Sequence, residues 1–323
     1  MSSSLSKVAF AFLCLAVCGE AFPQAYPSRP ITLIVTLSPG SQSDIVGRLL
    51  AGHMQTTLGQ PVVVENRVGA DGTIAAEAVS KAAPDGYTLL YAVSGTLAIA
   101  PHMYAGKMRY DTERDLAPIA QVARASFILT ASAGLPAANL KQFIDYTHAH
   151  PRSAAFGHLL GAAYLLALRT KQVTGADVEL IAYKGAPPIW TDLYGGRIHA
   201  GLETLGAAYP QIKAGKLKAL AVLGSSRSPM IPDVATVREQ GYPEMEGEGW
   251  NALLTRAGTP PAIIDRLYRE VVRIVAIPDV QERLEKAGVE IKTSDPQSLA
   301  RTIREDSARW GKIIHDFGVK LEN

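Results

Sequence analysis

The chain has 323 residues, 47% of them hydrophobic, and is therefore long enough for two ordinary domains that each bury a core. Its formal net charge is +2, with lysines and arginines scattered along the sequence. The sequence has no basic stripe of the kind that binds nucleic acid, so we expect no nucleic-acid partner.

The N-terminal segment is typical of a secretory signal peptide. Residues 8–17 form an apolar run that follows a lysine and is too short to span a bilayer. The small residues Gly19 and Ala21 suit the positions before a cleavage site, and a cut after Ala25 is the alternative. We therefore expect residues 1–25 to direct export to the periplasm and to be removed.

Both cysteines lie inside this segment. Removal of Cys14 and Cys18 leaves a mature protein without disulfides or thiolate chemistry. The four residues that end at Cys18 loosely resemble a lipobox, but the bulky Val17 fits that motif poorly. A freely soluble periplasmic product is favoured over a lipoprotein anchored at Cys18.

After the signal peptide, apolar strands alternate with amphipathic helices. The first section predicts strands at 31–37, 62–65 and 88–93 and helices at 44–57 and 73–83. The second predicts strands at 127–131, 154–156, 179–183, 198–202 and 217–223 and helices at 139–150, 162–172, 187–194 and 207–214. The last section predicts a strand at 250–254 and helices at 262–276, 279–286 and 296–316.

This alternation predicts two α/β domains, each with a mainly parallel sheet flanked by helices. The C-terminal helices are expected to return to the first domain, with chain crossings near Ala123 and near residues 247–249. The expected domains are 26–124 together with 248–323, and 125–247.

Small, hydroxyl-bearing and glycine residues are concentrated where strands lead into helices. Ligands of parallel α/β sheets bind beyond the carboxyl ends of the strands, where helix N-termini carry unpaired N–H groups and a partial positive charge. Such loops suit an anion, most simply a carboxylate. Four loops have this composition: Ser38-Pro39-Gly40-Ser41 with Asp44 behind it, Ser94-Gly95-Thr96, residues 157–161 with His158, and Lys184-Gly185-Ala186.

Taken singly, each of these loops is more often an ordinary cap or turn than a binding site. Asp44 could simply cap its helix, and Lys184 could simply be a solvated charge. The recurrence of the same loop chemistry in both halves of the chain favours a shared ligand site.

Catalytic signals are weak. The sequence contains no G-x-S-x-G, P-loop, H-E-x-x-H or G-x-G-x-x-G motif, and its histidines lack metal-ligand spacing. A secreted hydrolase that uses His158 with Glu203 or Asp192 is the alternative to a binding protein, but no motif places these groups together. We expect no enzyme activity, cofactor or metal.

Long segments of the mature chain resemble the Bug family, the substrate-binding proteins of tripartite tricarboxylate transporters (TctC-like). The segments that carry the resemblance follow one another over nearly the whole mature length and include YPSRPITLIV, LSPGSQSD, LGQPVVVENRVGADGTIAAEAVSKAAPDGYTLL, SGT, AYKGAPP, DLYGGRI, IKAGKLKALAV, RSPMIPDVATVREQGYPEM and GWNALLTRAGTPPAIIDRL. The resemblance implies a periplasmic clamshell of the type II kind. It also implies a small carboxylate held between two domains, largely by backbone N–H groups.

The family's partners are transporter subunits in the membrane. A sensor role, in which the closed form docks on a membrane signalling protein, would use the same binding chemistry, so the sequence leaves the two open. We expect a monomer.

The resemblance also implies ligand-binding positions. In the first domain these are Ser38, Pro39, Gly40, Ser41, Asp44, Ser94, Gly95 and Thr96; in the second they are Phe156, Gly157, His158, Tyr183, Lys184, Gly185, Ala186 and Glu203. The chain departs from the family pattern at Ser38, usually proline, at Ser41, usually glycine, and at Glu203, usually aspartate. From Phe156, Leu159 and Leu160 we hypothesise a larger, more apolar pocket that suits an aromatic carboxylate.

Overall fold

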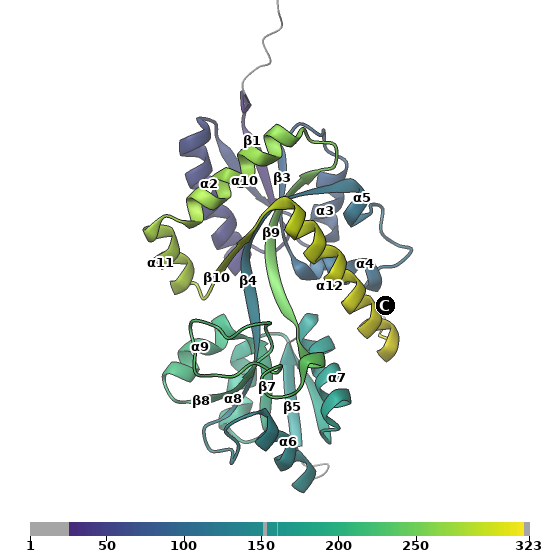
Figure 1. Ribbon diagram of the computed structural model, residues 1–323, viewed down its shortest axis with the longest axis vertical. Helices are drawn as coiled ribbons and strands as arrows, with labels where there is room; N and C mark the ends of the chain where they lie inside the picture. Colours follow the sequence, from purple (N-terminus) through teal and green to yellow (C-terminus); the bar gives the residue numbers. More distant parts are fainter. Residues whose placement is uncertain (1–25, 151–153, 160, 320–323) are drawn as a thin grey trace, which may run out of the picture.

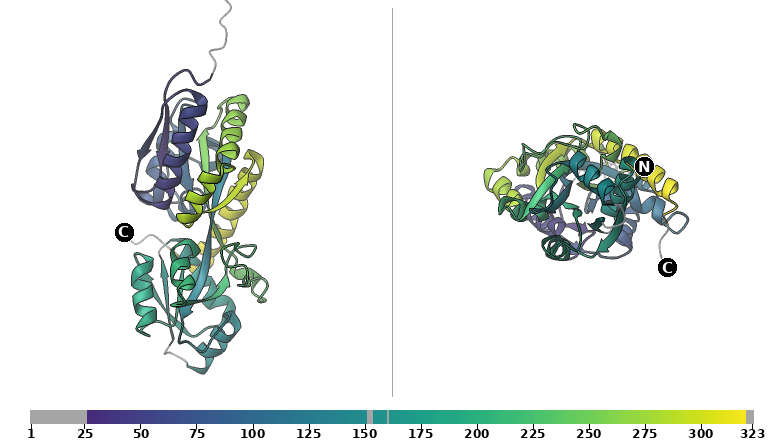
Figure 2. Two further views of the ribbon diagram at one scale, coloured as in Figure 1. Left: turned by 90° about the vertical axis from the view of Figure 1, so that its left-hand side faces the viewer. Right: turned by 90° about the horizontal axis from the view of Figure 1, so that it is seen from below.

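The computed structural model describes residues 26–150, 154–159 and 161–319, so the expected signal peptide lies outside the described residues. The chain forms two lobes stacked along the long axis of the molecule (Figure 1). Turning the molecule by 90° shows the same two lobes, connected by long strands (Figure 2).

Lobe 1, at the top of Figure 1, is built from both ends of the chain. Its first part contains β1 (Ile31–Val35), α2 (Gln42–Leu58), β2 (Val62–Asn66), η1 (Ala70–Gly72), α3 (Thr73–Ser80), β3 (Thr88–Val93), η2 (Gly95–Ile99), α4 (Ala100–Met103) and α5 (Thr112–Asp115). Its second part contains β9 (Glu248–Arg256), α10 (Pro261–Val275), α11 (Pro278–Lys286), β10 (Glu290–Ser294) and α12 (Pro296–Phe317).

Lobe 2 is formed by the middle of the chain. It contains α6 (Leu140–Ala149), β5 (Ala154–Leu159), α7 (Ala162–Thr174), β6 (Val178–Tyr183), α8 (Ala186–Tyr194), β7 (Ala200–Thr204), α9 (Leu205–Lys213), β8 (Leu217–Val222) and η3 (Pro243–Met245). Its helices flank the sheet, as the hydrophobic periodicity predicts.

One strand, β4 (Leu116–Ser132), belongs to both lobes. Its first part pairs with β9 and β10, and its last residues, from Phe127 on, pair with β7 and β8. The sequence predicts only residues 127–131 of this strand and misses β10. Pro118 and Gln121 interrupt the apolar pattern of β4, and both lie at the irregularities where its register with β9 shifts.

The parallel strands of both lobes end beside the segment of β4 that connects the lobes. In lobe 1, β1 pairs in parallel with β2 and β3, and Val93 at the end of β3 pairs with Asn251 near the start of β9. In lobe 2, β5 pairs in parallel with β6 and β7, and Thr204 at the end of β7 pairs with Phe127. The loops after these strands therefore lie on the sides of the two lobes that face each other, and the predicted α/β class is confirmed.

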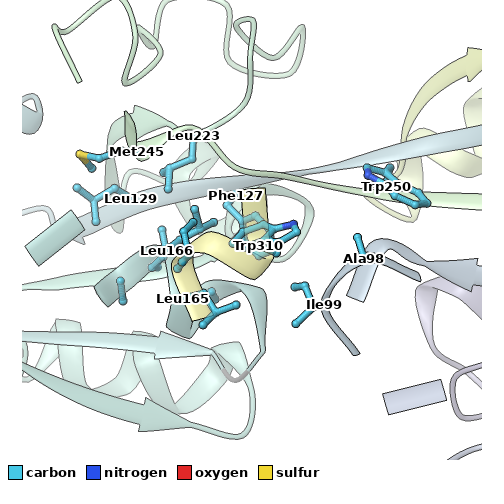
Figure 3. Close-up of a cluster of buried hydrophobic side chains, with 14 of the residues drawn as sticks. Ala98, Ile99, Phe127, Leu129, Leu165, Leu166, Leu223, Met245, Trp250 and Trp310 are labelled. Atoms are coloured by element: carbon cyan, nitrogen blue, oxygen red, sulfur yellow. The ribbon is translucent and has the colours of Figure 1, made fainter. Parts of the chain in front are cut away.

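A hydrophobic cluster continues from one lobe into the other. Trp310 of α12 is fully buried and lies beside Leu165 and Leu166 of α7 (Figure 3). The same cluster contains Ile99 of lobe 1 and Phe127 of β4. The C-terminal helix thus packs against lobe 1 and also contacts α7 of lobe 2.

A buried arginine lies where the chain passes between the lobes. Arg124 donates from Nε to Glu290 Oε2 at 2.9 Å and from Nη1 to Ser226 Oγ at 2.9 Å. It also lies 3.3 Å from Glu248 Oε1, and its Nη2 donates to the carbonyl of Arg227 at 3.2 Å. The guanidinium group therefore connects two acidic side chains of lobe 1 to the loop that follows β8.

We predict that Arg124→Ala destabilises the fold by about 3–5 kcal/mol, because it leaves Glu290 buried without its partner. Removing Arg29 from its exposed pair with Asp85 is the control, and should cost no more than about 1 kcal/mol. Urea unfolding of the two variants measures both effects. Equal losses in the two variants would contradict the importance of the buried pair.

Candidate functional site

A cavity of about 320 Å³ lies between the two lobes. Its lobe 1 wall contains Leu37, Asp71, Val93, Gly95, Thr96, Ile99, Ala100 and Met103. Its lobe 2 wall contains Gly161, Ala162, Tyr164 and Leu165, and Val319, which follows α12, completes the lining. Most of these side chains are apolar, so the cavity suits a solute with an apolar body.

Two helical segments begin at this cavity, one from each lobe. The continuous segment η2–α4 begins at Gly95, and α7 begins after Gly161. The first N–H groups of a helix have no intrahelical partner, and the N-terminal end of the helix dipole is positive. In both of these segments, no side chain caps the N-terminus. Gly161 has φ 70° and ψ −129°, a conformation that is essentially restricted to glycine. The cavity therefore offers main-chain donors to an anion from both sides.

The second predicted loop is part of this site. Gly95 and Thr96 line the cavity, whereas Ser94 is buried behind them and its Oγ accepts a hydrogen bond from Trp250 N at 3.4 Å. Thr96 donates from Oγ1 to the carbonyl of Asp71 at 2.7 Å, which connects the start of η2 to η1.

The first predicted loop does not line the cavity, although Leu37 just before it does. Within the loop, the N–H of Gly40 donates to Asp44 Oδ2 at 2.9 Å, and the N–H of Asp44 donates to Ser41 Oγ at 3.2 Å. Ser38 and Pro39 are exposed. At least one amide of this loop is therefore occupied by the chain's own carboxylate.

Asp44 is a buried structural carboxylate. Arg48 Nε donates to Asp44 Oδ2 at 3.0 Å, and Asn66 Nδ2 donates to Asp44 Oδ1 at 2.8 Å. Burial alone would raise the pKa of Asp44, but the hydrogen bonds from Arg48, Gly40 and Asn66 hold its pKa below the usual value. Asp44 is ionised and fully partnered, and it lies in the first turn of α2, whose N-cap is Ser41.

The third predicted loop is wrong in part. Gly157 and His158 are not in a loop, because β5 continues to Leu159 and pairs with β6. The absence of a Cβ at Gly157 leaves room for the side chain of Ile198, since a Cβ there would lie 2.7 Å from Ile198 Cδ1. Phe156 is fully buried and packs edge-on against Phe143, with ring centroids 6.3 Å apart, so it belongs to the core of lobe 2 and does not line the cavity.

His158 supports the cavity wall from behind. Its ring stacks on Tyr164, which lines the cavity, with centroids 5.0 Å apart. Its Nδ1 lies 2.9 Å from the carbonyl of Leu159, and burial lowers the pKa of His158. The imidazole is therefore neutral near pH 7 and acts as a packing group in this structure.

The fourth predicted loop lies at the start of α8, outside the cavity lining. Lys184 is exposed, Gly185 precedes the helix, and Ala186 is buried. Tyr183 donates from its hydroxyl to Asp192 Oδ2 at 2.6 Å, and burial together with that carboxylate raises the pKa of Tyr183 to about 12. These contacts fix the loop to its own helix.

Glu203 is buried in lobe 2 and is also outside the cavity lining. Thr130 Oγ1 donates to Glu203 Oε1 at 3.0 Å, and Trp190 Nε1 donates to Oε2 at 2.7 Å. Burial raises the pKa of Glu203 to about 7, although both hydrogen bonds favour the ionised form.

The groups of the hydrolase alternative have separate partners. His158 contacts Leu159 and Tyr164, Glu203 contacts Thr130 and Trp190, and Asp192 is hydrogen-bonded by Tyr183 and also pairs with Arg197. In the described part of the chain, no hydrogen bond joins any two of the three. Within residues 26–150, 154–159 and 161–319, no group of three or more His, Cys, Asp or Glu is arranged to hold a metal ion.

Most residues of the cavity wall were not predicted from the sequence. Gly95, Ile99 and Met103 recur every four residues, a helical spacing that places them on one face, and this signal was available. Asp71 carried no signal, because its contact with the cavity depends on the fold. None of the helices in the described ranges is both long and apolar enough to cross a membrane.

A two-lobed α/β fold with a cavity lined by both lobes defines the class of extracytoplasmic solute-binding proteins. Within this class, the chain belongs to the tripartite tricarboxylate transporter family receptors, whose family model matches residues 46–319. It is 36% identical over 313 residues to Protein BugT of Bordetella pertussis, an alignment that covers 95% of this chain and 96% of that protein.

Two solved structures show the same fold. MatC from Rhodopseudomonas palustris, solved with bound malate, is 31% identical with a TM-score of 0.70, over 90% of this chain and 100% of that one. The periplasmic binding protein BugD is 30% identical with a TM-score of 0.72, over 92% of this chain and 100% of that one. The predicted family resemblance is confirmed.

We predict that stability depends on the charge of Glu203. Its folded pKa of about 7 lies above the ordinary 4.5, so its stabilising contribution is complete below pH 4.5 and is lost as the pH rises through 7. The difference of about 2.5 pKa units corresponds to roughly 3 kcal/mol. Glu203→Gln should therefore be more stable than the wild type at pH 8 and lose little between pH 5.5 and pH 8.

Chemical denaturation at pH 5.5 and pH 8 measures this difference. Glu282→Gln, at an exposed pair with Lys286, is the control and should keep the wild-type pH dependence. Parallel pH profiles for the wild type and Glu203→Gln would show that Glu203 does not titrate in this range.

Proposed function

We propose that the protein is a periplasmic receptor that binds a small carboxylate-containing solute between its two lobes and delivers it to membrane subunits of a tripartite tricarboxylate transporter. The observation that carries the proposal is the pair of uncapped helical N-termini, at Gly95 and Gly161, that open into one cavity from opposite lobes. The malate in MatC supports a carboxylate as the ligand class.

We further propose that the ligand acts by closing the lobes. A solute that contacts both lobes stabilises the closed form by its differential affinity, and no chemical step is needed. The proposed domains are 26–124 with 248–323, and 125–247. The change of partners along β4 between Ser126 and Phe127 supports a hinge there.

We also propose that the protein is exported by a signal peptide and is a monomer. The N-terminal 25 residues would act as a signal peptide, and the mature protein would be a free monomer without lipid at Cys18. A monomer suits a clamshell that must open and close and then dock on membrane subunits.

Native mass spectrometry of the protein as purified from the periplasm, followed by isothermal titration with mono- and dicarboxylates, tests the ligand class. We expect a co-purified organic acid and binding of at least one carboxylate. Retention of a neutral or cationic solute only, with no carboxylate bound, would defeat the proposal.

We predict that Ala162→Phe weakens carboxylate binding by more than about tenfold, because the ring occupies the cavity at the N-terminus of α7. Ala162 is half-buried, so the fold should tolerate the ring. Ala300→Phe on α12, also half-buried and outside this cavity, is the matched control. Isothermal titration should show wild-type affinity for the control; equal affinity for both variants would place the ligand elsewhere.

We predict that Gly206→Ala also weakens binding, by about tenfold, by opposing approach of the lobes. Gly206 of α9 meets Gly288, between α11 and β10, so closely that a Cβ at Gly206 would lie 2.3 Å from the carbonyl oxygen of Gly288. Gly134→Ala, where a Cβ has open space, is the control. Small-angle scattering with and without ligand should show impaired compaction for Gly206→Ala only, and normal compaction would refute the prediction.

A further inference from the structure

The cavity between the lobes carries one acidic group and no basic one. Among its described lining residues, Asp71 is the one with a formally charged side chain, and neither lysine nor arginine lines the space. The other lining residues with polar side chains are Thr96 and Tyr164. A second carboxylate on a bound solute would therefore add to the negative charge of Asp71, with no cationic side chain in the lining to compensate for either charge.

The backbone around Asp71 is held in an unusual conformation. Ala70 has φ 45° and Asp71 has φ 52°, both in the left-handed region that non-glycine residues rarely adopt. Such residues persist where the surrounding structure holds them in place. Here the Thr96 Oγ1 donates to the Asp71 carbonyl at 2.7 Å, and Gly72 packs so tightly that a Cβ there would lie 2.3 Å from Thr96 Oγ1.

The Asp71 carboxylate itself is oriented by Tyr104. The Tyr104 hydroxyl donates to Asp71 Oδ2 at 3.0 Å. Burial, together with this carboxylate, raises the pKa of Tyr104, so the phenol keeps its proton and remains a donor. No lysine or arginine forms an ion pair with Asp71 in the described part of the chain, so its negative charge is not neutralised by the protein.

We propose that Asp71 is a specificity-determining residue that selects solutes with one carboxylate, an apolar body and a hydrogen-bond-donating group such as an ammonium, and that it discriminates against dicarboxylates. This inference rests on the proposed carboxylate-binding function. The carboxylate of the solute binds at the helical N-termini that begin at Gly95 and Gly161, and the donor group of the solute faces Asp71.

The proposed selectivity comes from the charge of Asp71, which attracts an ammonium group of the solute and repels a second carboxylate. The hydrogen bond from Thr96 to the main-chain carbonyl of Asp71 holds the backbone of Asp71 beside the start of η2, and Asp71 lines the same cavity as Gly95 and Gly161. Ile99, Met103 and Leu165 give apolar walls to the cavity that Asp71 lines, and Asp71 itself is exposed to solvent. An ammonium gains a charge-assisted hydrogen bond, whereas a second carboxylate meets a like charge.

A matched ligand series tests the proposal. Isothermal titration of the mature protein would use benzoate, 4-(aminomethyl)benzoate and terephthalate, together with pentanoate, 5-aminopentanoate and glutarate. We expect the amine-bearing acid of a series to bind the wild type at least about tenfold more tightly than its diacid. Asp71→Asn should reduce that ratio by about tenfold or more, because it removes the charge at constant size.

Asparagine is the suitable replacement because it tolerates the left-handed conformation of Asp71. Asp265→Asn, on the exposed surface of α10, is the control and should keep the wild-type ratio. Thermal unfolding of both variants verifies that they are folded.

The outcomes separate this inference from the proposed function. Two results would contradict the role of Asp71 and leave the proposed carboxylate-binding function intact. One is that the wild type binds a diacid more tightly than the matching amine-bearing acid. The other is that Asp71→Asn leaves the ratio of these two affinities unchanged. Failure of all six acids to bind any of the proteins would count against both. Binding of the amine-bearing acids with a ratio that collapses only in Asp71→Asn would establish the assignment.

Discussion

The architecture depends on one strand that changes partners along its length. β4 pairs with β9 and β10 in lobe 1 and with β7 and β8 in lobe 2, without leaving the extended conformation. Because backbone hydrogen bonds fix the direction of each neighbouring strand, the parallel strands of both lobes end beside the segment of β4 that connects the lobes. The helix N-termini that follow them face each other, and a cavity with donors from both sides is a consequence of this topology.

The periodic elements could be predicted from the sequence, and the shared strand could not. The predicted strand at 88–93 and the predicted helices at 162–172 and 296–316 agree with the structure to within a residue or two, because apolar spacing decides them locally. β10 and the first part of β4 have broken apolar patterns, since Arg124 and Glu290 form a buried ion pair and Gln121 is a buried polar residue. Their strand character comes from pairing with distant segments.

The candidate site shows the same division. Gly95 and Thr96 were predicted from composition and do line the cavity, whereas Asp44 and Glu203 accept hydrogen bonds from residues of their own lobes. A carboxylate that caps a helix and one that lines a cavity are indistinguishable in the sequence. Only tertiary contacts separate them, which explains why Asp71 was overlooked.

The position of Trp310 has a consequence for how such proteins diversify. The C-terminal helix contributes this ring to a cluster that includes Leu165 and Leu166, so a complete interior for either half requires residues from the other. The halves are therefore not autonomous modules that recombination could exchange intact. Exchanging a whole lobe would divide this shared interior, whereas a point replacement along the cavity wall leaves it intact.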